Sequence, residues 1–117
     1  MMSETPHTPG FDLRVDHHGS TAILRVSGEF DMVGAERVDA CVDELVRNSP
    51  DAVVIDLRAV TFLDSTGLRS LIRARARGAD AEWSLKLVRG SEPVHRVLTL
   101  TRMDEHFDFV EPGDLDE

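Results

Sequence analysis

The chain of 117 residues is long enough for one domain, and its 41% hydrophobic content is enough for a modest core. A formal net charge of −9 argues against binding to nucleic-acid phosphates or to an anionic membrane surface, and no apolar run approaches the ~20 residues of a membrane span. Because Cys41 is the only cysteine and no signal-peptide pattern is present, we expect a reducing, cytoplasmic location.

The N-terminal part of the chain predicts a tail followed by a hairpin. Residues 1–10 contain two prolines, a glycine and polar side chains, so we expect a flexible tail. Apolar and polar residues alternate over Phe11–His18, which is typical of a strand with one solvent-facing side. Gly19-Ser20 predicts a tight turn, and the alternation over residues 22–26 predicts the returning strand.

A helix and a buried strand are expected next. Apolar residues recur at helical spacing from about Val33 to Arg47, with Asp31 as the candidate N-cap, and Asn48-Ser49-Pro50 ends this helix. The nearly unbroken apolar run within Ala52–Leu57 predicts a central strand that is covered on both faces.

After that strand we expect a loop of about seven residues and a second helix, which ends at Gly78-Ala79-Asp80. Its first turn contains Asp64-Ser65-Thr66-Gly67, with Phe62 and Leu63 anchoring the turn from the preceding loop. Further on, Trp83–Val88 predicts a strand.

The C-terminal third predicts one more helix and a short strand. The helix begins at Ser91 or Glu92 with Pro93 in its first turn, and Phe107–Val110 predicts a short edge strand. From Asp104 onward the chain contains seven acidic residues and no Lys or Arg, so we expect its end to be solvated.

These elements predict an α/β fold with a mixed sheet of four to five strands and helices mainly on one face, because strand–helix–strand crossovers favour parallel pairing. We expect a flexible tail over residues 1–10, a single domain over residues 11–110 and an acidic tail over residues 111–117. We also expect a monomer.

The turn before the second helix admits two interpretations. Ser, Thr and Asp are the preferred helix caps, so Asp64-Ser65-Thr66 could serve folding alone. Gly67 requires a further reason, because glycine in a helix costs about 0.5–1 kcal/mol relative to alanine. It predicts a close backbone approach by a neighbouring loop or by a partner, with Ser65 presented outward.

Enzymatic alternatives fit poorly. A serine nucleophile favours a glycine two residues before it, and Leu63 stands there instead. Asp56 lacks the acidic pair after the first strand that a phosphoacceptor site of the receiver type requires. His17 and His18 point to opposite faces of a strand, so they do not share a metal ion. We therefore expect no catalytic residue, no metal and no cofactor.

Four separate pieces of the chain resemble sequence motifs of one known family. Each motif alone is a weak indication, but their order and spacing together are specific. With them the chain resembles a STAS domain, closest to the bacterial anti-sigma factor antagonists. The resemblance covers roughly residues 11–110. The matching pieces are Gly28-Glu29-Phe30-Asp31, Val54-Ile55-Asp56-Leu57, Thr61-Phe62-Leu63-Asp64-Ser65-Thr66-Gly67-Leu68 and Pro93-Val94-His95-Arg96-Val97-Leu98. The chain departs from the pattern at Thr101-Arg102-Met103, where such proteins often have a glycine before the final strand.

The resemblance implies a regulatory binding protein, not an enzyme. In that family a cognate anti-sigma factor with serine kinase activity phosphorylates the serine that corresponds to Ser65, which ends binding, and a phosphatase resets it. The residues expected at the partner surface are Glu29, Asp31, Asp64, Ser65, Thr66, Gly67 and Arg69. We expect the fold to tolerate the phosphate, because unpaired backbone N–H groups and the helix dipole favour an anion at a helix N-terminus.

Two further alternatives stay open. Arg69, Arg73 and Arg77 form a stripe on the second helix, which is either a solvated face or a strip that meets an acidic partner. The whole domain could also be a STAS scaffold or a subunit of a stress-sensing or transport complex, with Ser65 as a structural helix cap.

Overall fold

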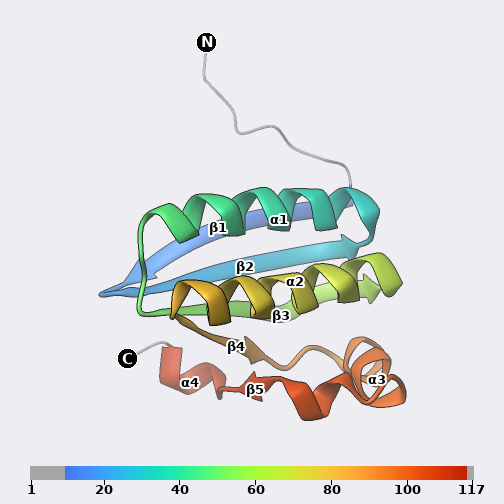
Figure 1. Cartoon of the computed structure of the whole chain (residues 1–117). Coiled ribbons are helices and arrows are strands. Elements are labelled where there is room, and N and C mark those ends of the chain that lie inside the picture. The colour runs from blue at the N-terminus through green and yellow to red at the C-terminus, as the bar shows by residue number, and fades with distance from the viewer. Residues whose placement is uncertain (1–9, 116–117) are drawn as a thin grey trace.

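The computed structural model describes residues 10–115, which form one five-stranded sheet with helices on both sides (Figure 1). The strands lie in the order β1-β2-β3-β4-β5. They are β1 (Phe11–His18), β2 (Thr21–Phe30), β3 (Ala52–Leu63), β4 (Ser84–Val88) and β5 (Asp108–Phe109). The β1–β2 hairpin is antiparallel and all other pairs are parallel, which confirms the predicted mixed sheet.

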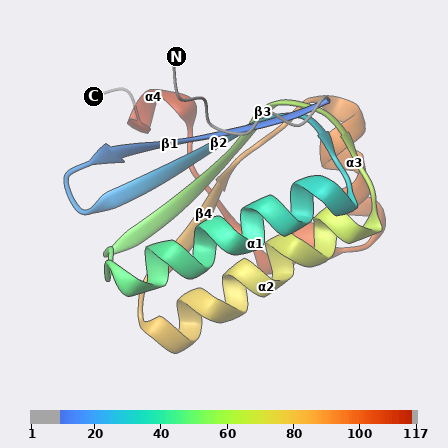
Figure 2. The ribbon, with the colours of Figure 1, turned by 90° about the horizontal axis from the view of Figure 1, so that it is seen from above.

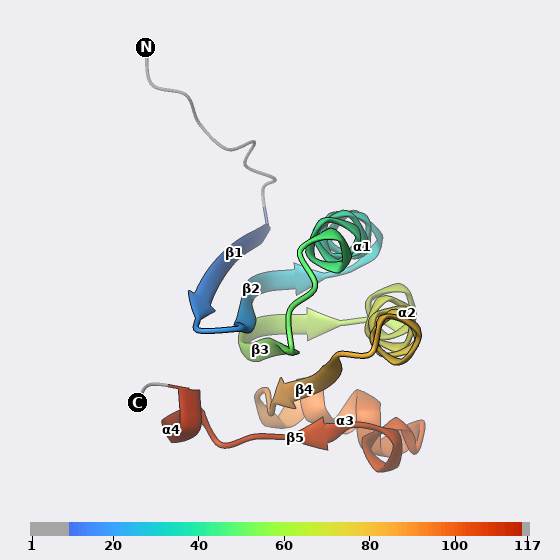
Figure 3. The same ribbon diagram turned by 60° about the vertical axis from the view of Figure 1, so that its left-hand side comes forward.

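Three helices cover one side of the sheet, which we call the helix face; the opposite side is the open face (Figures 2 and 3). The helices are α1 (Met32–Arg47), α2 (Ser65–Ala81) and α3 (Glu92–Leu100), and a 3-10 turn (Met103–His106) follows α3. A short fourth helix, α4 (Pro112–Leu115), lies on the open face. The prediction that helices lie mainly on one face is therefore confirmed.

Burial follows the sequence pattern of the central strands. Every residue from Val53 to Leu57 is buried, as predicted for a strand with cover on both faces. The main core lies between the sheet and the helix face, and its fully buried members include Leu24, Phe30, Ile55, Leu57, Leu71, Leu87 and Leu98.

The predicted loop after Leu57 is wrong, because β3 continues as a strand to Leu63. Its pairing with β2 slips by one residue twice, once between Arg25 and Ser27 and once between Gly28 and Glu29. Each slip is a β-bulge that adds one residue to β3. Buried residues therefore recur three apart, at Leu57, Val60 and Leu63. The alternation of apolar and polar residues that is typical of a strand is lost there, so the sequence pattern predicts a loop.

The C-terminal end also differs from the expectation of a solvated tail. Leu115 of α4 is buried on the open face against Ile23, Val54 and Val88. Residues 1–9 and 116–117 lie outside the described residues, and the predicted N-terminal tail falls almost wholly among them.

Helix ends agree with the prediction to within a few residues. The second helix continues through Gly78 to Ala81. Gly78 has a packing role within the helix, because the ring of Trp83 lies 2.7 Å from where an ideal Cβ of Gly78 would be. Arg102, after α3, has a φ of 61°, so an arginine here takes the left-handed conformation that glycine adopts most easily.

Candidate functional site

Ser65 is the first residue of α2, directly after β3, and its side chain is exposed. The N-cap is Asp64, whose Oδ1 accepts hydrogen bonds from the amides of Thr66 and Gly67, at 3.0 Å each, and from the Thr66 hydroxyl at 2.6 Å. The Ser65 hydroxyl makes no hydrogen bond within residues 10–115. The alternative that Ser65 is a structural cap is therefore wrong, since Asp64 has this role.

The same geometry corrects the expectation of unpaired amides at this helix end. Two of the first amides of α2 already donate to the Asp64 carboxylate. Burial alone would raise the pKa of Asp64, but the hydrogen bonds from Thr66 and Gly67 outweigh it and lower the pKa below its ordinary value. The cap is therefore a carboxylate at neutral pH, and Ser65 stands next to a fixed negative charge.

Gly67 packs so closely against the end of β2 that there is no room for a side chain at this position. An ideal Cβ at Gly67 would lie 2.3 Å from the carbonyl oxygen of Phe30 and 2.7 Å from Cδ1 of Leu63. The amide of Asp64 also donates to this carbonyl, at 3.4 Å. The predicted close backbone approach is confirmed, and the approaching segment is the end of β2.

This contact brings the beginnings of α1 and α2 together at one end of the sheet. Asp31 caps α1, as predicted, because its Oδ1 accepts from the amides of Val33 and Gly34 at 3.2 and 3.5 Å. The exposed Glu29 pairs in register with Phe62 on β3. The two turns that contain the predicted surface residues thus follow adjacent strands, β2 and β3.

Three exposed apolar side chains at this end were not predicted as surface residues. Met32 is 61% exposed, Val33 is 43% exposed and Phe62 is 50% exposed. Phe62 was expected to anchor the turn, but only Leu63 points into the core. We call Glu29, Met32, Val33, Phe62, Ser65 and Arg69 the rim. A sequence signal existed for Met32-Val33, since two apolar residues directly after a helix cap precede the buried stripe.

The arginine stripe of α2 divides into two parts. Arg73 pairs with Asp39 of α1, with its Nη2 2.8 Å from Oδ2, and Arg77 pairs with Asp43 of α1. These two arginines therefore join the helices instead of only facing solvent. Arg69 is exposed and makes no ion pair within residues 10–115.

Arg69 also lines a small hollow between α1 and α2. The hollow has a volume of about 150 Å³, and Met32 and Thr66 contribute to its wall. Arg69, the arginine of α2 that is nearest to Ser65 in sequence, therefore lies at the rim.

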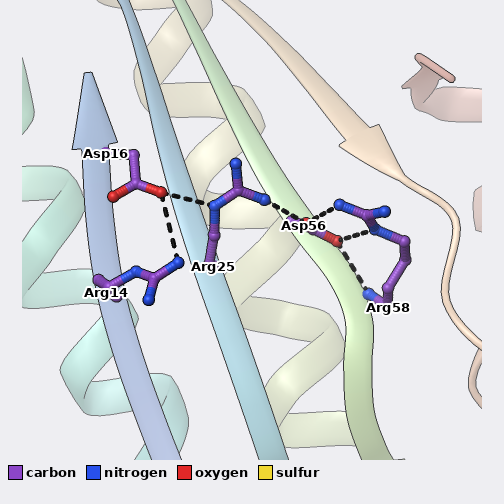
Figure 4. Close-up of polar contacts among 5 residues, drawn as sticks. All are labelled: Arg14, Asp16, Arg25, Asp56 and Arg58. Atoms are coloured by element: carbon purple, nitrogen blue, oxygen red, sulfur yellow. Dashed lines mark hydrogen bonds and ion pairs between the residues drawn. The ribbon is translucent and has the colours of Figure 1, made fainter. Parts of the chain in front are cut away.

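A second charged cluster lies on the open face (Figure 4). Arg14 and Asp16 of β1, Arg25 of β2, and Asp56 and Arg58 of β3 alternate in charge across three strands.

Asp56, the carboxylate at the centre of this cluster, is only 6% exposed. Its Oδ2 lies 2.9 Å from Nη1 of Arg25 and 2.8 Å from Nη2 of Arg58. Burial would raise the pKa of Asp56, but the bonds from Arg58 and the charge of Arg25 lower it. Asp56 is therefore a paired structural carboxylate, which argues against the phosphoacceptor alternative.

Other chemistry has little support in the described part of the chain. Within residues 10–115, no three His, Cys, Asp or Glu side chains converge as a metal site would require. In the same range, none of the helices has the length and hydropathy needed to span a bilayer.

Comparison with known proteins agrees with this geometry. The family model of the STAS domain matches residues 12–113. The anti-sigma-F factor antagonist RsfB of Mycobacterium tuberculosis is 37% identical over 84 residues, which cover 68% of this chain and 67% of that protein.

Solved structures show the same likeness. The crystal structure of an anti-sigma factor antagonist from Mycobacterium paratuberculosis has a TM-score of 0.78 and 34% identity, and covers 90% of this chain and 89% of that chain. The phosphorylated form of the Bacillus cell fate determinant SpoIIAA shares the fold, with a TM-score of 0.70, 13% identity, and coverage of 89% and 96%. From the family model and these relatives, the chain belongs to the STAS domain family, among the anti-sigma factor antagonists.

Proposed function

We propose that this protein binds a cognate anti-sigma factor that has serine kinase activity, and that phosphorylation of Ser65 by this partner ends the binding. A phosphatase would reset Ser65, and the cycle would take place in the cytoplasm. The observation that carries the proposal is the exposed Ser65 hydroxyl, without a hydrogen bond in the described residues, at the rim of a domain of this family.

The rim has the composition of a protein-binding surface. Met32, Val33 and Phe62 present apolar side chains to solvent at the same end of the sheet as the acidic Glu29 and the basic Arg69. Covering the exposed part of such a side chain contributes about 1 kcal/mol. The three together would supply a few kcal/mol of contact energy, while the flanking charges would orient the partner.

Phosphorylation would change this surface without unfolding the domain. The hydroxyl oxygen of Ser65 attacks the γ-phosphorus of ATP, the bond to the ADP oxygen breaks, and the hydroxyl proton is released. The phosphate adds about −1.5 to −2 charges at pH 7. Since Ser65 is exposed, the core is not disturbed.

The phosphate would remain at the surface, beside Asp64, where the partner has to approach. A loss of roughly 3 kcal/mol would weaken binding more than a hundredfold, because each 1.4 kcal/mol corresponds to a factor of ten. No large conformational change is needed.

Incubation with ATP and candidate anti-sigma kinases, followed by phosphosite mapping, tests the modification. We expect phosphate on Ser65 in the wild type and in Thr66→Ala, and none in Ser65→Ala. Thr66 is a matched control because its hydroxyl is adjacent but donates to Asp64. Phosphate that persists in Ser65→Ala would contradict the proposal.

Partner binding is tested separately by calorimetry with the anti-sigma factor. Ser65→Ala should retain binding and Ser65→Glu should lose it, while both variants should show the wild-type circular dichroism spectrum. Phe62→Ser should weaken binding about tenfold without preventing phosphorylation of a saturating concentration of substrate. Equal affinities for the Ser65→Ala and Ser65→Glu variants would refute the switch.

A further inference from the structure

Two backbone amides and one hydroxyl that a phosphate on Ser65 could use are already occupied. Oδ1 of Asp64 accepts from the amides of Thr66 and Gly67 and from the Thr66 hydroxyl. The lowered pKa of Asp64 keeps this acceptor charged at neutral pH. A phosphate on Ser65 would have to displace the Asp64 carboxylate to bind these amides, whereas binding a nearby cation requires no such displacement.

Arg69 is the cation that the helix places within reach. Residues i and i+4 of a helix are neighbours on its surface, with Cβ atoms roughly 5–6 Å apart. Helical side chains also lean toward the N-terminus, so we expect the Arg69 side chain to extend toward the turn that contains Ser65.

The other arginines of the stripe are not equivalent. Arg73 and Arg77 are further along α2 and are held by Asp39 and Asp43 of α1. Arg69 has no such ion pair within residues 10–115 and lies at the hollow beside Thr66. Ordering its side chain around a new anion would break no existing ion pair.

We propose that Arg69 binds the phosphate group of phosphorylated Ser65 within the same helix. This inference rests on the proposed function, because that function places the phosphate on Ser65. Phosphorylation then has two effects on the rim: it adds a negative charge, and it withdraws the guanidinium of Arg69 from the partner. Both effects act in the same direction if the partner presents an acidic group to Arg69.

The test uses the full chain with phosphoserine installed at position 65 during translation, so that no kinase is required. The second pKa of the phosphate is measured by phosphorus NMR at low ionic strength. Arg69→Gln should raise this pKa by roughly 0.3 unit, the size expected for an exposed ion pair of this spacing. Arg75→Gln, on the same helix and also exposed, should leave this pKa unchanged within about 0.1 unit. In 0.5 M salt the effect of Arg69→Gln should largely disappear.

Two results would overturn the inference. One is an equal phosphate pKa in the protein with Arg69 and in the Arg69→Gln variant. The other is a large shift of the Thr66 and Gly67 amide resonances as the phosphate loses its second proton, because this would mean that the phosphate has displaced Asp64. Neither result affects the proposed switch, which fails only if no kinase modifies Ser65 or if modification leaves binding unchanged.

Discussion

Replacing Gly67 by alanine should destabilise the fold, although alanine is the better helix former. The added Cβ would lie 2.3 Å from the Phe30 carbonyl oxygen, whereas ordinary contacts begin near 3.4 Å, so the backbones of α2 and β2 must separate by about 1 Å. Overpacking of this kind costs about 1–3 kcal/mol, and the weakened bond from the Asp64 amide adds about 1 kcal/mol. Helix propensity returns about 0.5–1 kcal/mol. The net loss is about 2 kcal/mol.

For a chain of 117 residues this loss corresponds to a Tm lower by about 8 °C, measured by circular dichroism. Gly113→Ala is the matched control, because Gly113 is also helical and no atom lies within 4 Å of its ideal Cβ. Its Tm should be unchanged or slightly higher. If Gly67→Ala melted together with the wild type, the close approach of α2 to Phe30 would not be the reason for this glycine.

Three further variants or measurements test features away from the rim. Asp56→Asn should cost about 2 kcal/mol at pH 7 in urea unfolding, because it leaves the guanidinium of Arg58 beside a neutral side chain. As the folded pKa of Asp56 is lowered, its contribution is present above about pH 5 and is lost as the pH falls through that pKa, so the acid loss of stability should be smaller in Asp56→Asn. Burial, with the charge of Glu44, raises the pKa of Cys41 to about 11, so iodoacetamide at pH 8 should react on the order of 100-fold more slowly in the folded protein than in urea; equal rates would contradict this. Arg102→Gly should raise the free energy of unfolding by about 0.5–1 kcal/mol, since φ is 61° at this position, and a lower Tm would argue against strain there.

The elements predicted best are those set by local residues. Helix α1 follows from its apolar stripe and from the Asp31 cap, both of which act within a few residues. The tight packing at Gly67 was also predicted, because a glycine that opposes helix propensity needs a steric reason. The partner of this contact, Phe30, was not predictable, since the register between β2 and β3 depends on two bulges.

The site was predicted in position but not in detail. Asp64, Ser65 and Thr66 are all capping residues, and which one caps depends on where β3 ends, which is set by its pairing with β2. The exposure of Met32 and Phe62 was not predicted, because the hydrophobicity of a residue does not by itself show whether other residues bury it in the folded protein. Arg73 and Arg77 were identified as a stripe, but their partners on α1 depend on how the two helices pack.

The two bulges of β3 have a consequence for changes in chain length. Because each bulge places one extra residue in β3, deleting that extra residue would restore regular pairing with β2 and leave Leu63 opposite Phe30, facing the core. Deleting both extra residues would remove both bulges, whereas a third deletion would break the register with β2 and draw Ser65 back from the end of that strand. The pairing of β3 with β2 therefore limits how far the chain between Asp56 and Ser65 can be shortened before the Ser65 hydroxyl moves, although the sequence of this segment resembles a loop of variable length.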